Sequence, residues 1–155
     1  MAKSLDFVRM ETSFKGLMNR AVAEFDRYME SDAGRYKWVF VEDPERIAHA
    51  LEILAEDIPE EHLAEVVPKL PYLFLMFRES DQEPIIPVEA TLAFLSVINT
   101  SGMITIMRQC SDRQQLADSF GVDSANWEPL IFMIGGVPNL DRVHDEDVSE
   151  NVSFF

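Results

Sequence analysis

The stretch PVEATLAFLSVINTSGMITIM, from Pro87 to Met107, decides the fold that the sequence predicts. Glu89 is its only ionisable residue, so a chain that is polar elsewhere is expected to bury this stretch in its core. The first half predicts a helix, because Pro87 suits a first helical position and apolar residues follow at helical spacing. Gly102 is then expected to end the helix in a left-handed conformation.

The same stretch is about 20 residues long, which is enough to cross a bilayer. However, Asn99, Thr100 and Ser101 interrupt it, and no cluster of Lys or Arg flanks either end. A membrane span is therefore disfavoured. The stretch is expected to lie in the protein core, with Phe94 and Leu95 largely buried.

Two further segments carry clear helix signals. Residues 13–29 repeat apolar side chains every three to four positions, and Ser13 can cap the start of that helix. Asp43 and Pro44 begin another amphipathic helix, which must break before Pro59. Shorter helices are expected at residues 59–67 and 112–120.

The best strand candidate is YKWVFV, from Tyr36 to Val41, which is short, aromatic and β-branched. Its partner would be residues 104–107 or the terminal residues 152–155, and an extended, unpaired segment remains an alternative. The apolar run from Pro71 to Phe77 predicts either a helical turn or a buried strand.

The sequence therefore predicts a mainly α protein, with a single compact domain of about five to seven short helices and at most a small β element. Residues 1–136 would form this helical domain. Residues 137–155 would form an acidic C-terminal tail that is extended or partly disordered.

Residues 113–130, RQQLADSFGVDSANWEPL, resemble a helix-turn-helix motif with Gly121 at the turn. The segment that would be the recognition helix has no Lys or Arg, and it contains Asp123, Glu128 and Pro129. Contacts to bases and phosphates need hydrogen-bond donors and positive charge. A plain helix–turn–helix corner that does not bind DNA is expected here.

The net charge is −15, with 28 acidic residues against 13 basic ones. Residues 1–40 carry six acids and seven bases, so the net negative charge lies entirely in the rest of the chain. A field of this sign disfavours direct binding to nucleic acid and to anionic membranes. It favours a basic protein partner, although solubility alone is an equal explanation.

One surface feature suggests a partner-binding site. At 100° per residue, the carboxylates of one helix, Glu45, Glu52 and Glu56, fall on the side opposite its apolar residues. Glu60 and Glu61 lie just beyond them. Such an acid ridge would steer a basic partner, or it is only a solvated helix face. The candidate aromatic anchors beside it, which could equally lie in the core, are Trp38, Phe154 and Phe155.

No motif for catalysis, cofactor binding or metal binding rises above background. The chain lacks a nucleotide-binding glycine pattern, and Cys110, the single cysteine, is expected to be a small buried side chain. His49 and His62 are expected to form surface ion pairs, and residues 144–147 a solvated tail. No catalytic residue, no cofactor and no metal is therefore predicted. Whether the protein is an enzyme is uncertain, and a protein without enzymatic activity is favoured.

These observations favour a non-enzymatic, acidic protein-binding factor of the inhibitor, immunity, chaperone or assembly-factor type, acting on a basic protein partner. A cytoplasmic location is expected, because the chain has one cysteine and no apolar leader. One alternative is a nucleic-acid mimic that occupies the basic groove of a DNA- or RNA-binding protein. The other is an enzyme with an unidentified carboxylate site.

Overall fold

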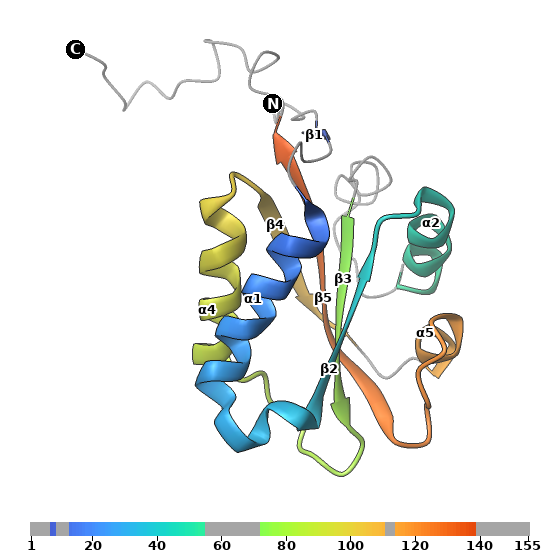
Figure 1. Cartoon of the computed structure of the whole chain (residues 1–155). Helices are drawn as coiled ribbons and strands as arrows, with labels where there is room; N and C mark the ends of the chain where they lie inside the picture. Colours follow the sequence, from blue (N-terminus) through green and yellow to red (C-terminus); the bar gives the residue numbers. More distant parts are fainter. Residues whose placement is uncertain (1–6, 9–12, 55–71, 111–113, 139–155) are drawn as a thin grey trace, which may run out of the picture.

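The computed structural model describes residues 7–8, 13–54, 72–110 and 114–138, and these form three layers (Figure 1). A β-sheet lies in the middle, with two helices on each face. The helices are α1 (Phe14–Met29), α2 (Pro44–Ile53), α4 (Val88–Thr100) and α5 (Gln114–Ser119), and the short 3₁₀ helix η1 spans Glu30–Arg35. The strands are β1 (Phe7–Val8), β2 (Tyr36–Val41), β3 (Tyr72–Glu79), β4 (Ile104–Gln109) and β5 (Trp127–Pro138). The predicted mainly α fold is therefore wrong.

The sheet is antiparallel and is built around β5. On one side β5 pairs with β3, which in turn pairs with β2, and on the other side it pairs with β4. The short strand β1 pairs with the end of β5, so Phe7 lies opposite Pro138. This pairing brings the segment before α1 to the end of β5.

The strand β3 explains why a sheet was not predicted. Every residue from Tyr72 to Arg78 is buried, because helices cover both faces of the sheet. Alternate side chains enter different cores: Leu73 and Leu75 pack towards α2 and α5, and Phe74 and Met76 pack towards α1 and α4. A strand buried on both faces loses the alternation of polar and apolar residues that marks a strand in a sequence.

The same cause explains the error at residues 127–134. WEPLIFMI forms the central strand β5, whose residues 130–136 are all buried, so the predicted helix–turn–helix corner is wrong. The strand at Tyr36–Val41 is confirmed, but its partner is β3. Residues 104–107 do form a strand, which pairs with β5, and residues 152–155 lie outside the described residues.

The two capped helices are confirmed. The Gly16 N–H donates a hydrogen bond of 3.1 Å to Ser13 Oγ at the start of α1. The Glu45 N–H donates a hydrogen bond of 3.1 Å to Asp43 Oδ1 at the start of α2. Each cap satisfies one of the backbone donors that a helix start leaves without a partner.

The central apolar stretch forms α4 and then β4. Gly102, between the two elements, has φ of +87°, as expected for the residue that ends the helix. Phe94 is fully buried, but Leu95 is only half-buried and Leu92 is 58% exposed. The stretch is thus not wholly in the core, because α4 lies in an outer layer and has one side away from the sheet.

Among the described residues, no helix is both long and apolar enough to cross a membrane. The helix predicted at residues 59–67 and the tail from residue 139 onwards lie outside the described part of the chain. The predicted division into a domain and a tail therefore stays a prediction.

Candidate functional site

A cluster of aromatic rings fills the space between the sheet and the α1–α4 layer. Phe14 stacks on Tyr72 with ring centroids 4.4 Å apart, and Trp38 stacks on Phe94 at 4.3 Å. Phe40 joins these two pairs, because it contacts both Phe14 and Trp38. The cluster gives this side of the sheet a rigid apolar floor.

A cavity of about 230 Å³ opens above one end of this floor, and we call it the α1–β2 pocket. The first two turns of α1 supply four of its residues, and the end of β2 and the residue after it supply the other two. The lining residues are Phe14, Lys15, Met18, Asn19, Phe40 and Glu42. The pocket therefore combines an ammonium group, an amide, a carboxylate and two aromatic rings.

The local electrostatics favour an anion at this end of α1. The first turn of the helix contains no acidic residue, and Lys15 is exposed there. The positive end of the helix dipole adds to the charge of that ammonium group. Five of the six lining residues belong to residues 1–40, which carry seven basic and six acidic residues, and the sixth is Glu42.

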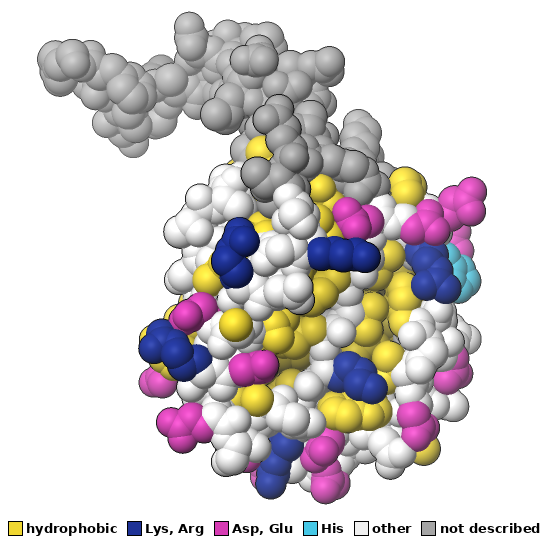
Figure 2. Space-filling view, in the orientation of Figure 1, with side chains coloured by type: hydrophobic (Ala, Val, Ile, Leu, Met, Phe, Trp, Pro, Cys, Tyr) yellow, Lys and Arg dark blue, Asp and Glu magenta, His cyan; other side chains and the backbone are white. Residues whose placement is uncertain are grey.

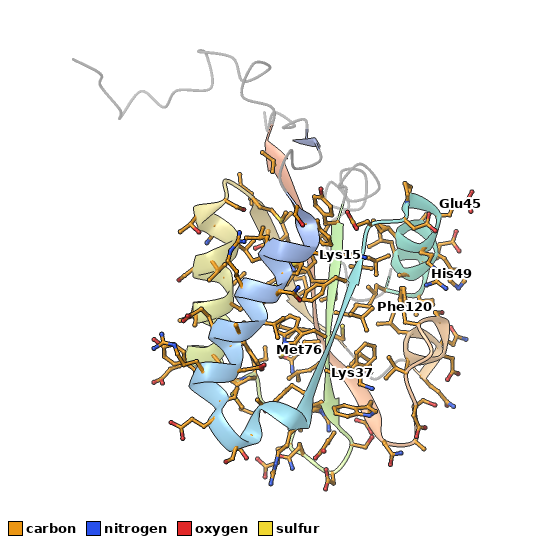
Figure 3. The ribbon with its side chains drawn as sticks, in the orientation of Figure 1. Lys15, Lys37, Glu45, His49, Met76 and Phe120 are labelled. Carbon is orange, nitrogen blue, oxygen red and sulfur yellow. The ribbon has the colours of Figure 1, made fainter. Side chains whose placement is uncertain are left out.

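Figure 2 shows hydrophobic side chains at the surface between α1 and β2, with basic side chains beside them. Figure 3 shows Lys15 near one end of this apolar band and Lys37 near the other. The Lys37 ammonium lies 5.0 Å from the centroid of the Trp127 ring. Nearby, burial raises the pKa of the Tyr36 phenol above its ordinary value of 10.0, and the Asp32 carboxylate raises it further.

Two other cavities are less suited to an anion. One is lined by Glu79, Asp81 and Trp127, among other residues, and so has two carboxylates and no cation in its lining. The other lies between α2 and α5, where Arg46 and His49 line it together with two acidic side chains. The Arg46 guanidinium there already lies 5.7 Å from the Phe120 ring centroid.

The structure separates the residues predicted to bind a partner. Glu45 and Glu52 are exposed on α2, which covers one face of the sheet. Trp38 belongs to the aromatic cluster on the opposite face and is only half-buried at its edge. The remaining members lie outside the described residues: Glu56, Glu60, Glu61, Phe154 and Phe155.

The residues of the α1–β2 pocket were not predicted from the sequence. Lys15 and Asn19 have the spacing of the polar face of an amphipathic helix, which is what most such residues form. Phe14 and Phe40 have the pattern of core residues, and both contribute to the core. Nothing in the sequence indicates that β2 ends beside the start of α1. In the described part of the chain, no group of His, Cys, Asp and Glu could hold a metal ion.

No protein-family model matches the sequence, and no curated protein shows significant similarity to it. Solved structures, in contrast, match nearly the whole chain. An FMN-dependent nitroreductase from Clostridium difficile is 12% identical with a TM-score of 0.62, and the match covers 99% of this chain and 94% of that one. An iodotyrosine deiodinase bound to FMN and 3-iodo-L-tyrosine is 13% identical with a TM-score of 0.63, over 98% and 95% of the two chains.

A third match is a Bacteroides thetaiotaomicron protein assigned as an NADH dehydrogenase or NAD(P)H nitroreductase. It is 13% identical with a TM-score of 0.62, over 96% of this chain and 92% of that one. The chain has the nitroreductase fold. At identities this low, the structural likeness establishes the shared fold alone. The cofactor and substrates named above are those of the compared proteins.

The prediction of a non-enzymatic acidic binding factor is contradicted by this likeness, because the proteins that share the fold are consistently oxidoreductases. The enzyme alternative is better supported. The error came from treating composition as function: a net charge of −15 bears on solubility and association, and many folds carry it.

Proposed function

We propose that the protein is a flavin-dependent oxidoreductase that uses FMN. The observation that supports this proposal is the fold, which almost the entire chain shares with proteins named for FMN or found with it. When bound, FMN accepts two electrons from a reduced donor and passes them to an organic acceptor.

FMN presents a planar ring system, a chain of hydroxyl groups and a phosphate with a charge of roughly −2. The α1–β2 pocket offers a group for each of these parts. The Lys15 ammonium and the start of α1 would hold the phosphate, since helix N-termini favour anions. The Asn19 amide can both donate and accept hydrogen bonds, as a polyol requires. The edges of Phe14 and Phe40 would border the ring.

The size of the pocket decides which part of FMN it would take. At about 230 Å³ it is smaller than the cavities of roughly 300–1,000 Å³ that enclose whole drug-sized ligands. It would therefore hold the phosphate and the hydroxyl chain. The ring would lie over the apolar band between α1 and β2 that Figure 2 shows. Met18 and Phe14, which are 2% and 8% exposed, would keep water from beneath it.

A direct test is titration of FMN with the purified protein, followed by the quenching of flavin fluorescence. Riboflavin has the same ring and hydroxyl chain but no phosphate, so it should bind at least about tenfold more weakly than FMN. Lys15→Ala should weaken FMN binding by about 10- to 100-fold and leave riboflavin binding nearly unchanged, because only the phosphate contact is lost.

The matched control is Arg27→Ala, which removes one positive charge from the same helix about 18 Å away. It should leave both affinities within a factor of about two. Failure of FMN to bind at all would contradict the proposed function. If FMN binds tightly and Lys15→Ala does not weaken its binding, the proposed function stands, but the phosphate must bind to another part of the protein.

The proposal includes a cytosolic location. The sequence supports it through its single cysteine, Cys110, which is buried in the core between the sheet and the α2–α5 layer. Fractionation of the native host with an antibody to the protein would test it. Recovery in an extracellular or envelope fraction would contradict it.

A further inference from the structure

The cavity between α2 and α5, which we call the α2–α5 cavity, lies on the face of the sheet opposite to the α1–β2 pocket. Its volume of about 380 Å³ falls within the range of roughly 300–1,000 Å³ that is typical of small-molecule sites. In Figure 3, Glu45, His49 and Phe120 lie to the right of β2, on the side away from α1. The lining residues come from the start of α2 and the end of α5, and they are Asp43, Glu45, Arg46, His49, Ser119 and Phe120.

Opposite charges share this cavity without pairing. The carboxylates belong to Asp43 and Glu45, and they precede the nitrogen donors along the chain. Those donors belong to Arg46 and His49. In the described part of the chain, no ion pair joins the carboxylates to the donors. At a rise of 1.5 Å per residue, the centres of the two pairs lie about 5 Å apart along α2. The cavity therefore presents an acceptor region and a donor region a few ångströms apart.

Contacts with the rest of the chain hold several of these groups in place. One oxygen of the Asp43 carboxylate accepts a hydrogen bond of 3.1 Å from a backbone N–H in the first turn of α2. The Ser119 hydroxyl donates a hydrogen bond of 2.8 Å to a backbone carbonyl of α5, so its oxygen can still accept one from a ligand. The Arg46 guanidinium lies 5.7 Å from the centroid of the Phe120 ring, which is half-buried and packs against the core. That ring forms an apolar wall.

This lining favours a ligand that carries both charges. A simple anion would be repelled by the two carboxylates, and a simple cation would be repelled by the guanidinium. We propose that the α2–α5 cavity binds a free α-amino acid with an apolar or aromatic side chain. Arg46 and His49 would hold its carboxylate. Asp43 and Glu45 would hold its ammonium group, and its side chain would pack on the Phe120 ring.

Isothermal titration calorimetry of the full chain with three related compounds tests the proposal. L-phenylalanine carries both charges, 3-phenylpropionate lacks the ammonium group, and 2-phenylethylamine lacks the carboxylate. L-phenylalanine should show saturable binding. Each of the other two should bind at least about tenfold more weakly, because it leaves one charged region of the cavity without a partner. None of these results depends on whether FMN binds.

Two variants test the assignment to this cavity. Arg46→Met keeps an apolar stem beside the ring of Phe120 and removes the charge, so it should weaken the binding of L-phenylalanine by at least about tenfold. Glu45→Gln should weaken it by a similar factor. The matched control is Glu52→Gln, which removes a carboxylate from an exposed position of the same helix about 10 Å from Glu45. It should leave the affinity within a factor of about two.

The comparison of the three compounds on the wild type decides the proposal even if a variant fails to fold. The proposal is overturned if L-phenylalanine shows no saturable binding at concentrations up to roughly 10 mM, or if either analogue binds as tightly. Binding that folded Arg46→Met and Glu45→Gln chains retain at full strength would also overturn it. Binding that Lys15→Ala abolishes would do so too, because the amino acid would then occupy the α1–β2 pocket.

Discussion

The aromatic side chains between the sheet and the α1–α4 layer show what single residues do in this protein. Phe94 on α4 is fully buried and stacks on Trp38, whose neighbour in the cluster is Phe40. The Trp38 indole N–H is buried and finds no hydrogen-bond acceptor among the described residues. Packing of the ring outweighs that loss, since large aromatic rings contribute most of the apolar area in a core.

Replacing Phe94 with alanine should destabilise the fold strongly. The change removes a buried ring that contacts three other rings, so the free energy of unfolding should fall by about 3–5 kcal/mol in denaturant melts. Ser96→Ala, on the exposed side of the same helix, should change it by no more than about 0.5 kcal/mol. Similar effects of the two substitutions would contradict the packing of α4 in which Phe94 faces the core.

Tyr36 should make stability depend on alkaline pH. Burial, aided by Asp32, raises the pKa of this phenol in the folded protein above the value of 10.0 in the unfolded chain. The stabilising contribution is therefore complete below pH 10 and is lost as the pH rises through the folded-state pKa. Tyr36→Phe should leave stability at pH 7 within about 1 kcal/mol and flatten the loss above pH 10. An unchanged alkaline limb in the variant would contradict this.

At the scale of helices and strands, the sequence predicted the elements that have one side facing solvent. The helices α1 and α2 alternate buried and exposed residues and begin with Ser13 and Asp43 as caps, so period and cap agree. The strands β3 and β5 are covered on both faces and carry uninterrupted apolar runs, which cannot be told from buried helix by periodicity. The fold class failed there, because those two strands form the centre of the sheet.

The turn after α5 contains Gly121, and a substitution at this residue can test the backbone conformation of the turn. Gly121 has φ of +68°, and an added Cβ would meet no atom within 4 Å, so any cost of Gly121→Ala must come from the backbone. That cost should be about 1–2 kcal/mol in the free energy of unfolding. Gly34→Ala is the matched control, because that site is equally open and its φ is not positive. It should change stability by no more than about 0.5 kcal/mol, and an equal loss at both sites would contradict the proposed strain.

At the scale of the whole molecule, three-dimensional adjacency creates the candidate site. The α1–β2 pocket exists because β2, which begins 22 residues after the start of α1, ends beside that start, and no sequence pattern states this. Trp38 was predicted to lie either beside the acid ridge or in the core, and the structure places it on the face of the sheet opposite to α2, which carries Glu45 and Glu52. The net charge is a property of the whole chain, and it does not indicate that Lys15 lies beside a pocket at the start of α1.

The most direct test of the central claim is turnover by the FMN-loaded protein. Oxidation of NADH or NADPH should be followed by nicotinamide absorbance, with a nitroaromatic compound as acceptor and with free FMN at the same concentration as the reference. We predict a rate that saturates with donor and rises in proportion to bound FMN, and that Lys15→Ala lowers at limiting FMN but not at saturating FMN. A rate no higher than that of free FMN, measured on protein shown to have FMN bound, would contradict the assignment as an oxidoreductase.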